Sequence, residues 1–173
     1  MNLPYDVTST NGDVKALALQ TQENFRSLIR ILNRLMTNGL TTISTNGESS
    51  DAILPGSPVY MTSAGAMKNA LANALESSIV FGVCVNTSSV AVGAPLSVQS
   101  TGFVVLTTGQ WAAISGQVGG LTPGRNYYLS VTTAGFVIST STSASAKYST
   151  LIGEAQTATK LKLSIEPSTY LFA

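Results

Sequence analysis

Histidine is absent from this chain of 173 residues, and charged residues make up only 10% of it. Without histidine, Ser-His-Asp and Cys-His catalytic arrangements are excluded, as is any zinc site that uses a histidine ligand. The long stretch Ser77–Ala146 contains a single charged residue, Arg125. Few groups are left to move protons or hold a metal, so the sequence predicts a protein that is not an enzyme and that binds no cofactor or metal.

Excess charge of either sign is also lacking. Nine Lys and Arg oppose eight Asp and Glu, for a net charge of +1, so we expect no nucleic-acid partner and no binding to an acidic membrane. The longest apolar run, Ile79–Val85, is far shorter than the ~20 residues of a membrane helix, and the N-terminus lacks the apolar segment of a signal peptide. We therefore expect a soluble protein made without Sec-type export.

Cysteine occurs once, at Cys84 inside that apolar run, which excludes a disulfide framework within the chain. No neighbour would stabilise a thiolate, so we interpret Cys84 as a small core residue. Ordinary soluble domains have roughly 25% charged residues. A mean hydropathy of +0.27 together with so little charge predicts that part of the surface is covered in an assembly.

The sequence pattern divides the chain into an N-terminal arm and helix, followed by a linker and a β-rich region. Residues 1–13 are polar and rich in turn formers, and we expect an extended arm there. Asp13 is a candidate N-cap, Val14–Thr37 contains no Gly or Pro, and Gly39 supplies a stop signal, so an amphipathic helix is predicted over residues 14–38. A linker over residues 39–52 and a β domain over residues 53–173 follow.

Apolar residues of the predicted helix follow a seven-residue repeat, with alternating spacings of four and three. Flanking Ile29, Ile31 and Met36 widen the seam, which favours a trimeric coiled coil over a dimer. An ordinary amphipathic helix lying on its own β domain is an alternative that the periodicity does not exclude. The predicted self-association positions are Val14, Ala18, Phe25, Leu28, Leu32 and Leu35, with polar Thr21 interrupting the repeat.

Arg26, Arg30 and Arg34 recur every four residues and would form a basic stripe on the face of the helix away from the seam. A solvated outer face is the ordinary interpretation. Because this is the densest positive patch of the chain, it is also the candidate contact with an acidic partner surface.

Short apolar segments separated by Gly, Pro, Asn and Ser turns fill the β domain. They predict a mainly β fold, an antiparallel β-sandwich or small barrel, behind the N-terminal helix. Ile79–Val85 is the candidate central strand, and Asn73–Glu76 is either a helical turn or a crossover. The other predicted strands are Val59–Met61, Met67–Ala70, Leu96–Ser100, Phe103–Leu106, Tyr127–Val131, Phe136–Ser139, Thr150–Ala155 and Leu161–Ile165.

Two motifs could carry chemistry, and both have a plainer interpretation. Glu48 and Asp51 are the closest acidic pair in the linker and β half, but they lie among Ser and Asn, so solvated charge is favoured over general acid–base work. Gly116–Gly120 has glycines but no GxxxxGK pattern, and a flexible turn is favoured over a phosphate cradle.

A resemblance to a known family begins in the run Gly120–Ser130 (GLTPGRNYYLS), continues through Thr132–Phe136, and ends in Ser149–Gln156 and Leu161–Ile165. This pattern resembles a β module of tailed-bacteriophage virion proteins, found in head fibres, capsid decoration proteins and some tail fibres. It covers roughly residues 55–166. Fibronectin-like sandwiches use a similar turn, but the early buried tryptophan of those domains is missing, since Trp111 comes late.

The resemblance implies a homotrimeric appendage on the virion, and it transfers no catalytic residue. Its partners would be further copies of itself and the major capsid protein or other virion proteins, with the arm and helix engaging the shell. A host surface glycan is a further candidate partner, at loop tips that include Tyr127 and Tyr148, although packing is the favoured role of both tyrosines.

Three hypotheses follow from the sequence. The first is a capsid decoration, cement or head-fibre protein on the outer surface of the head. The second is a short tail fibre or tail adaptor that contacts the host or baseplate. The third, from a different class, is a cellular adhesion or carbohydrate-binding β module.

Overall fold

The computed structural model describes residues 20–21, 24, 39–139 and 148–171. The chain forms two units, Met1–Met36 and Thr37–Ala173. In the first unit Gln20, Thr21 and Asn24 have helical backbone and exposed side chains. The predicted arm lies outside the described residues, as do Val14, Ala18, Phe25, Leu28, Leu32, Leu35, Arg26, Arg30 and Arg34. The apolar seam, the basic stripe and the trimer therefore stay predictions.

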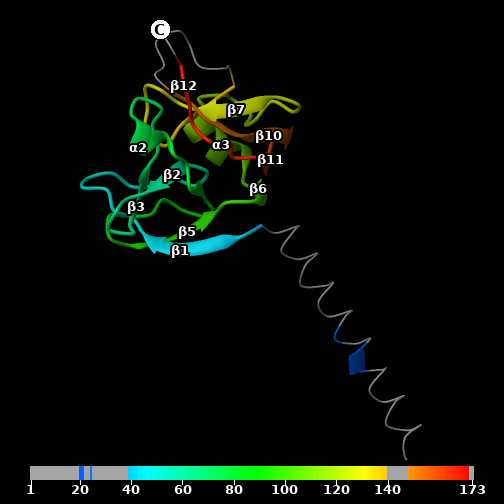
Figure 1. The fold of residues 1–173 in the computed structure, drawn as a ribbon. Coiled ribbons are helices and arrows are strands. Elements are labelled where there is room, and N and C mark those ends of the chain that lie inside the picture. The colour runs from blue at the N-terminus through cyan, green and yellow to red at the C-terminus, as the bar shows by residue number, and fades with distance from the viewer. Residues whose placement is uncertain (1–19, 22–23, 25–38, 140–147, 172–173) are drawn as a thin grey trace, which may run out of the picture. The chain divides into compact units, whose positions relative to one another are not determined.

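The second unit contains two five-stranded antiparallel sheets (Figure 1), so the prediction of a mainly β, antiparallel fold is confirmed. The first sheet has the order β1-β5-β4-β2-β3. Its strands are β1 (Thr41–Thr45), β2 (Pro58–Met61), β3 (Met67–Asn69), β4 (Gly82–Cys84) and β5 (Pro95–Gln99).

This first sheet curls until its two edge strands meet at one point. Asn46, which follows β1, forms a parallel bridge to Met67, and the Gly47 N–H donates to the Met67 carbonyl oxygen at 2.8 Å. The strands pair no further, so the sheet is not a closed barrel and that alternative is wrong. The curl encloses a core of its own, made of Ile53, Val59, Met67, Cys84, Val90, Leu96 and Val98.

The second sheet has the order β6-β11-β10-β7-β8. Helix α3 (Thr108–Ser115) follows its first strand, and helix α2 (Leu75–Ser78) lies between β3 and β4 in the chain. A separate two-stranded ribbon pairs β9 (Tyr148–Ser149) with β12 (Thr169–Tyr170). The strands of the second sheet are β6 (Gly102–Val105), β7 (Asn126–Leu129), β8 (Val137–Ile138), β10 (Leu151–Thr157) and β11 (Lys160–Leu163).

A second, larger core joins the two sheets. Val83 of β4 and Leu161 of β11 belong to it, and Trp111 of α3 lies within it with no exposed surface. The indole Nε1–H donates to the Thr159 carbonyl oxygen at 3.0 Å, so the one polar atom of the buried ring has a partner. Because apolar groups from both sheets share this core, the two sheets form one folding unit.

Strand positions agree with the sequence where apolar and polar residues alternate, as in β7 and β11. The predicted central strand Ile79–Val85 is only partly right. β4 does lie in the middle of the first sheet, but it is limited to Gly82–Cys84, because α2 ends at Ser78 and its C-cap, Ile79, has an exposed side chain. A side chain at Gly82 would lie 2.6 Å from the Gln99 carbonyl oxygen, so only glycine lets β4 approach β5 there.

Residues 39–52, predicted as a linker, instead contribute strand β1 to the first sheet. Thr41–Thr45 pairs with the whole of β5, from Thr41↔Gln99 to Thr45↔Pro95. The Leu40 N–H donates to the Thr101 hydroxyl oxygen at 3.0 Å, which anchors the start of the strand. The Ser- and Thr-rich composition of the segment suggested a loop, but an edge strand exposed on one face needs little apolar content.

Helix α3 has no counterpart among the predicted elements. Its start is a capping box in which Thr107 and Gln110 satisfy each other's backbone N–H groups. Gly116 ends the helix in the left-handed conformation with φ 67°. Thr-x-x-Gln before an apolar segment is a recognised start signal, so the sequence contained the information, although Thr108-Gly109 suggested a turn.

Candidate binding surfaces

A polar pocket of about 300 Å³ opens where the loop after β1 meets the turn before β8. Residues from three separate segments line it, and both acidic residues of the pair noted in the sequence are among them. The lining residues are Glu48, Asp51, Ala52, Leu54, Ser57, Asn69, Thr133, Ala134 and Phe136.

Asn46 holds the loop that carries the two acidic residues. Its side chain is buried, and its Nδ2 donates to the carbonyl oxygens of Val90 at 2.8 Å and Asp51 at 3.1 Å. Its Oδ1 accepts from the Glu48 N–H at 2.9 Å. Since this one buried side chain ties the loop to Val90 through bonds at Glu48 and Asp51, the two acidic residues are presented to the pocket in a defined position.

Glu48 is fixed a second time by strand β3. Its Oε1 accepts from the Asn69 backbone N–H at 2.7 Å. A hydrogen bond to a charged acceptor is stronger than one between neutral groups. The carboxylate therefore has one oxygen engaged by the sheet, and a ligand would meet the other.

Two polar groups at the base of the pocket have unmet hydrogen-bonding capacity. Asn69 Oδ1 is buried without a partner in the described part of the chain. Ser57 is only 3% exposed, and no described residue hydrogen-bonds its hydroxyl. Leaving a buried polar atom unpaired costs roughly 1–3 kcal/mol, so Asn69 Oδ1 marks a place where the described chain does not satisfy its own polar groups.

Gly135 packs closely against both of these groups. A Cβ atom there would overlap Asn69 Oδ1 and lie 3.1 Å from Ser57 Oγ, and the backbone has φ 74°. Glycine is required for both reasons. The turn is anchored by the Gly135 N–H, which donates to the Ala70 carbonyl oxygen at 2.8 Å, and Phe136 then contributes to the lining of the pocket.

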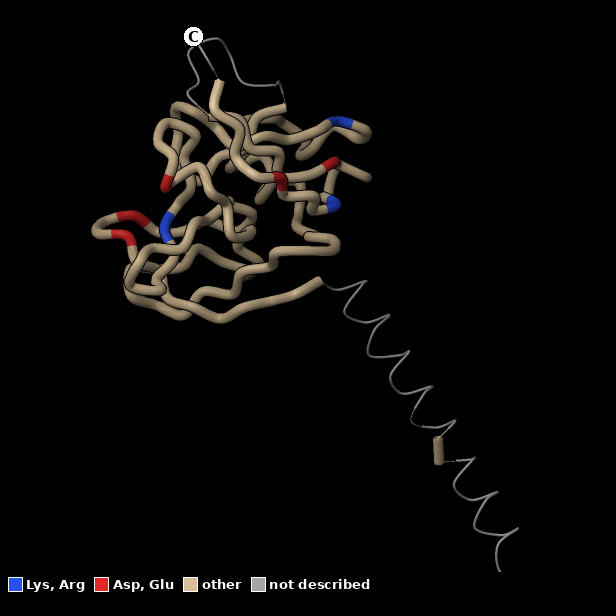
Figure 2. Tube along the Cα trace, in the orientation of Figure 1, with Lys and Arg blue, Asp and Glu red and all other residues tan. Residues whose placement is uncertain are grey.

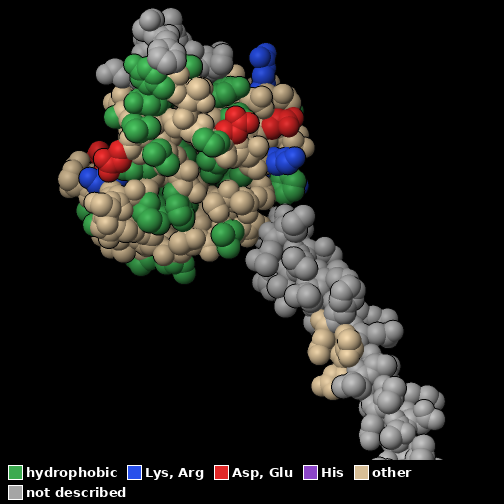
Figure 3. Space-filling view, in the orientation of Figure 1, with side chains coloured by type: hydrophobic (Ala, Val, Ile, Leu, Met, Phe, Trp, Pro, Cys, Tyr) green, Lys and Arg blue, Asp and Glu red, His purple; other side chains and the backbone are tan. Residues whose placement is uncertain are grey.

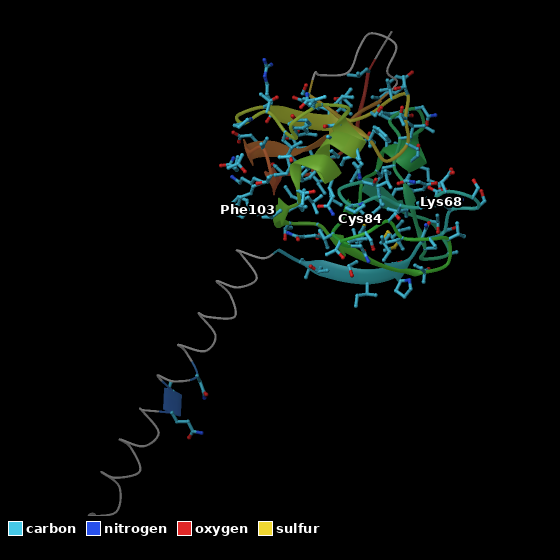
Figure 4. All side chains as sticks on the ribbon, turned by 180° about the vertical axis from the view of Figure 1, so that it is seen from behind. Lys68, Cys84 and Phe103 are labelled. Carbon is cyan, nitrogen blue, oxygen red and sulfur yellow. The ribbon has the colours of Figure 1, made fainter. Side chains whose placement is uncertain are left out.

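Positive charge is sparse in the second unit (Figure 2), and none lines the pocket. Lys68 belongs to β3 but is not among the lining residues. Lys160 places its Nζ 4.1 Å from the centroid of the Phe103 ring, and Figure 4 shows Phe103 and Lys68 at opposite sides of the unit. The pocket is therefore lined by two carboxylates and by no Lys or Arg side chain that would neutralise their charge.

Two titrating groups of the first sheet have perturbed pKa values. Burial raises the pKa of the Tyr60 phenol, and the carboxylates of Glu76 and Glu48 raise it further. Burial also raises the pKa of the Cys84 thiol, and a hydrogen bond from the Asn86 backbone only partly opposes this rise. Both groups are protonated at neutral pH. Cys84 lies in the interior (Figure 4), so its predicted place in the core is confirmed.

A second candidate surface is the open edge of β1. The Ser100 N–H donates to the Leu40 carbonyl oxygen, so the ladder leaves the backbone groups of Thr41 and Ile43 pointing away from β5. No described strand pairs with this edge. It has no charge and no proline, and the Ile43 side chain is 77% exposed. Such an edge is a template for pairing with another chain.

Apolar surface also appears elsewhere on the second unit (Figure 3), but it is divided among separate places. Met61, Ile79 and Phe81 line a hollow of about 330 Å³ beside α2. Val105 and Leu106 line another of about 410 Å³ beside the start of α3. Val118, on the turn after α3, is fully exposed.

The other candidate residues from the sequence take structural roles. Tyr127 is fully buried, and its hydroxyl accepts from the Thr122 N–H at 2.8 Å and donates to Gln117 Oε1. Tyr148 packs edge-on against Tyr170, with ring centroids 5.4 Å apart. Gly116–Gly120 forms the end of α3 and the turn after it.

Sequence reasoning found Glu48 and Asp51 but missed the rest of the pocket. Ser57, Asn69 and Gly135 lie on three segments far apart in the chain, and no spacing connects them. Solvated charge was the favoured interpretation of the acidic pair. Asp51 is exposed, as that interpretation requires, whereas Glu48 is half-buried and bound to β3.

No protein-family model matches this sequence, and the search of curated proteins finds no relative. Within the described ranges, no helix combines the length and apolar character needed to cross a membrane. No group of three or more Cys, Asp or Glu side chains gathers as a metal site in the same part of the chain.

Proposed function

We propose that this chain is a non-enzymatic structural protein of a tailed-bacteriophage virion. In this proposal it forms a homotrimeric decoration, cement or head-fibre protein on the outer surface of the head. The arm and helix of residues 1–38 attach it to the shell, with Arg26, Arg30 and Arg34 as the contact with acidic capsid surface. The β unit faces outward.

The observation that carries the proposal is the open, uncharged edge of β1. Monomeric proteins protect such edges with charge, proline or a covering element, and β1 has none of these among the described residues. A second copy of the chain would cover it. Together with the seven-residue repeat that precedes β1 in the sequence, this open edge supports the proposal that the protein self-associates as part of a larger assembly.

The resemblance of roughly residues 55–166 to virion β modules supports a location on the virion. Decoration needs no catalytic group, because a ligand that binds only the assembled shell stabilises it by mass action. A charge-poor, mainly β unit with a self-associating helix suits that task.

Antibody labelling of purified phage particles, viewed by electron microscopy, tests the proposal. Label distributed over the head is the expected result. Label confined to the tail would replace the decoration role with that of a tail fibre or adaptor, and particles without label would favour a cellular adhesion module.

A further inference from the structure

The polar pocket between the loop after β1 and the turn before β8 is incomplete as it stands. The Ser57 hydroxyl and Asn69 Oδ1 have no hydrogen-bond partner among the described residues, while Glu48 and Asp51 stand beside them. These groups lie on segments that hydrogen bonds already hold in place. Polar groups with free hydrogen-bonding capacity, held in place around a concavity, point to a ligand site.

The chemistry of the lining selects the ligand. The lining has two carboxylates, which accept hydrogen bonds, and the hydroxyls of Ser57 and Thr133, which both donate and accept. It has no Lys or Arg, so an anionic ligand is disfavoured. Phe136 and Leu54 add apolar surface to the same pocket. A ligand with several hydroxyl groups and an apolar C–H face satisfies both halves of this lining.

The size of the pocket limits the class of ligand further. About 300 Å³ lies at the lower end of ligand pockets, which suits one small ring and not an extended peptide. We propose that this pocket binds a neutral sugar ring, with its hydroxyls donating to Glu48 and Asp51 and a further hydroxyl meeting Ser57.

The residues that face the ring then have defined tasks, whereas the buried Asn69 Oδ1 does not contact it. The oxygen of Glu48 that the Asn69 N–H does not engage accepts one sugar hydroxyl, and exposed Asp51 accepts another at the rim. Ser57 meets the deepest hydroxyl of the ring. Phe136 lies against the C–H face, and Gly135 keeps the base of the pocket free of a side chain.

An NMR titration of the full-length, ¹⁵N-labelled chain tests this assignment. The probes are methyl α-D-glucopyranoside, methyl β-D-galactopyranoside, methyl α-D-mannopyranoside and N-acetyl-D-glucosamine, each in buffer with EGTA. We expect at least one of them to shift the amide signals of Asn69, Gly135 and Phe136, with a dissociation constant on the order of 1 mM, as is usual for so small a ligand. The anionic N-acetylneuraminic acid is expected to leave them unchanged.

Variants separate pocket binding from non-specific contact. Asp51→Asn removes an exposed carboxylate and leaves the loop anchored, since the hydrogen bond from Asn46 uses only the backbone carbonyl oxygen of Asp51. It should weaken sugar binding about tenfold, because a charged acceptor is lost. Glu154→Gln, on exposed β10 surface, is the matched control and should change affinity by less than about twofold.

Several outcomes would overturn the proposal. They are the absence of shifts with every neutral sugar, equal affinity in Asp51→Asn and the unsubstituted chain, equal weakening by Glu154→Gln, or stronger binding of the anionic sugar. Calcium chloride alone shifting the same amides would assign the carboxylates to a cation instead. The inference does not rest on the virion proposal, because the titration uses the isolated protein and the labelling experiment uses particles.

Discussion

Asn46→Ala should destabilise the β unit and loosen the loop that carries Glu48 and Asp51. The substitution removes three hydrogen bonds made by a side chain that is 1% exposed. Each such bond contributes about 0.5–1.5 kcal/mol, so the three together contribute about 1.5–4.5 kcal/mol. The Val90 carbonyl oxygen keeps a second donor, the Ile53 N–H at 3.0 Å, and the Asp51 carbonyl lies at an exposed residue that water reaches. We therefore expect a loss of about 2 kcal/mol.

Urea unfolding followed by the fluorescence of Trp111 measures this loss, because the only tryptophan is fully buried. With a slope of about 2 kcal/mol per molar urea, the midpoint should fall by about 1 M. Asn126→Ala is the matched control: Asn126 is exposed, so its midpoint should move by less than about 0.25 M. All variants are compared at one protein concentration, since self-association raises apparent stability.

An unchanged midpoint for Asn46→Ala would refute the reasoning, because it would mean that the three hydrogen bonds stabilise the folded state no more than hydrogen bonds with water stabilise the unfolded chain. Equal losses in Asn46→Ala and Asn126→Ala would refute it as well. In that case burial would not distinguish the two asparagines, and the loop would be held by something other than the Asn46 side chain.

Three further predictions concern assembly and the thiol. Ile43→Lys places a charge on the open edge of β1 and should shift the mass measured by analytical ultracentrifugation towards that of a monomer. The control Val118→Lys, at a fully exposed turn position, should leave the mass unchanged. Equal masses for both variants and the unsubstituted chain would contradict a role for this edge in assembly. Phe25→Asp combined with Leu32→Asp buries charge in the predicted seam and should abolish trimers, and an unchanged mass would show that the seam is wrong. Because burial raises the pKa of Cys84, its thiol should be alkylated by iodoacetamide at pH 8 far more slowly in the folded chain than in urea, and equal rates would contradict its burial.

The two proposals place different demands on the same β unit. The proposed assembly would use the edge of β1, whereas the pocket is formed by the loop that follows β1 and by the turn before β8. Because the loop begins at Asn46, where the end of β1 bridges to β3, covering the edge with a second copy would also restrain one wall of the pocket. A homotrimer would then present several sugar sites at once, and weak individual sites gain overall affinity when they bind together.

Local patterns in the sequence were sufficient to predict the strands that have one face buried and the other exposed to solvent. Alternation in Tyr128–Val131 and Leu161–Ile165 predicts half-buried antiparallel strands, and the structure has strands at Asn126–Leu129 and Lys160–Leu163, each beginning and ending slightly earlier than predicted. Composition excluded His-dependent chemistry outright, and the isolated Cys84 in an apolar run was correctly assigned to the core. In each case the property depends on the residue itself or on its near neighbours, so no knowledge of the fold was needed.

Elements with little apolar content, or with conflicting signals, required the tertiary structure. β1 is a strand because it pairs with β5 through a ladder of backbone hydrogen bonds. Its own Ser- and Thr-rich sequence does not predict that pairing. Ile79–Phe81 is not part of β4, although its apolar residues fit a strand, because α2 occupies the chain up to Ser78 and leaves Ile79 exposed.

The pocket depends on the tertiary structure most of all. The sequence placed Glu48 and Asp51 near each other, but it offered no reason to join them with Ser57, Asn69 and Gly135. Those residues meet because the first sheet curls and brings the start of β3 to the end of β1, while the turn before β8 folds back onto Ala70. Composition and periodicity are local properties of a chain, whereas the convergence of distant polar groups is created only when the sheets pack together.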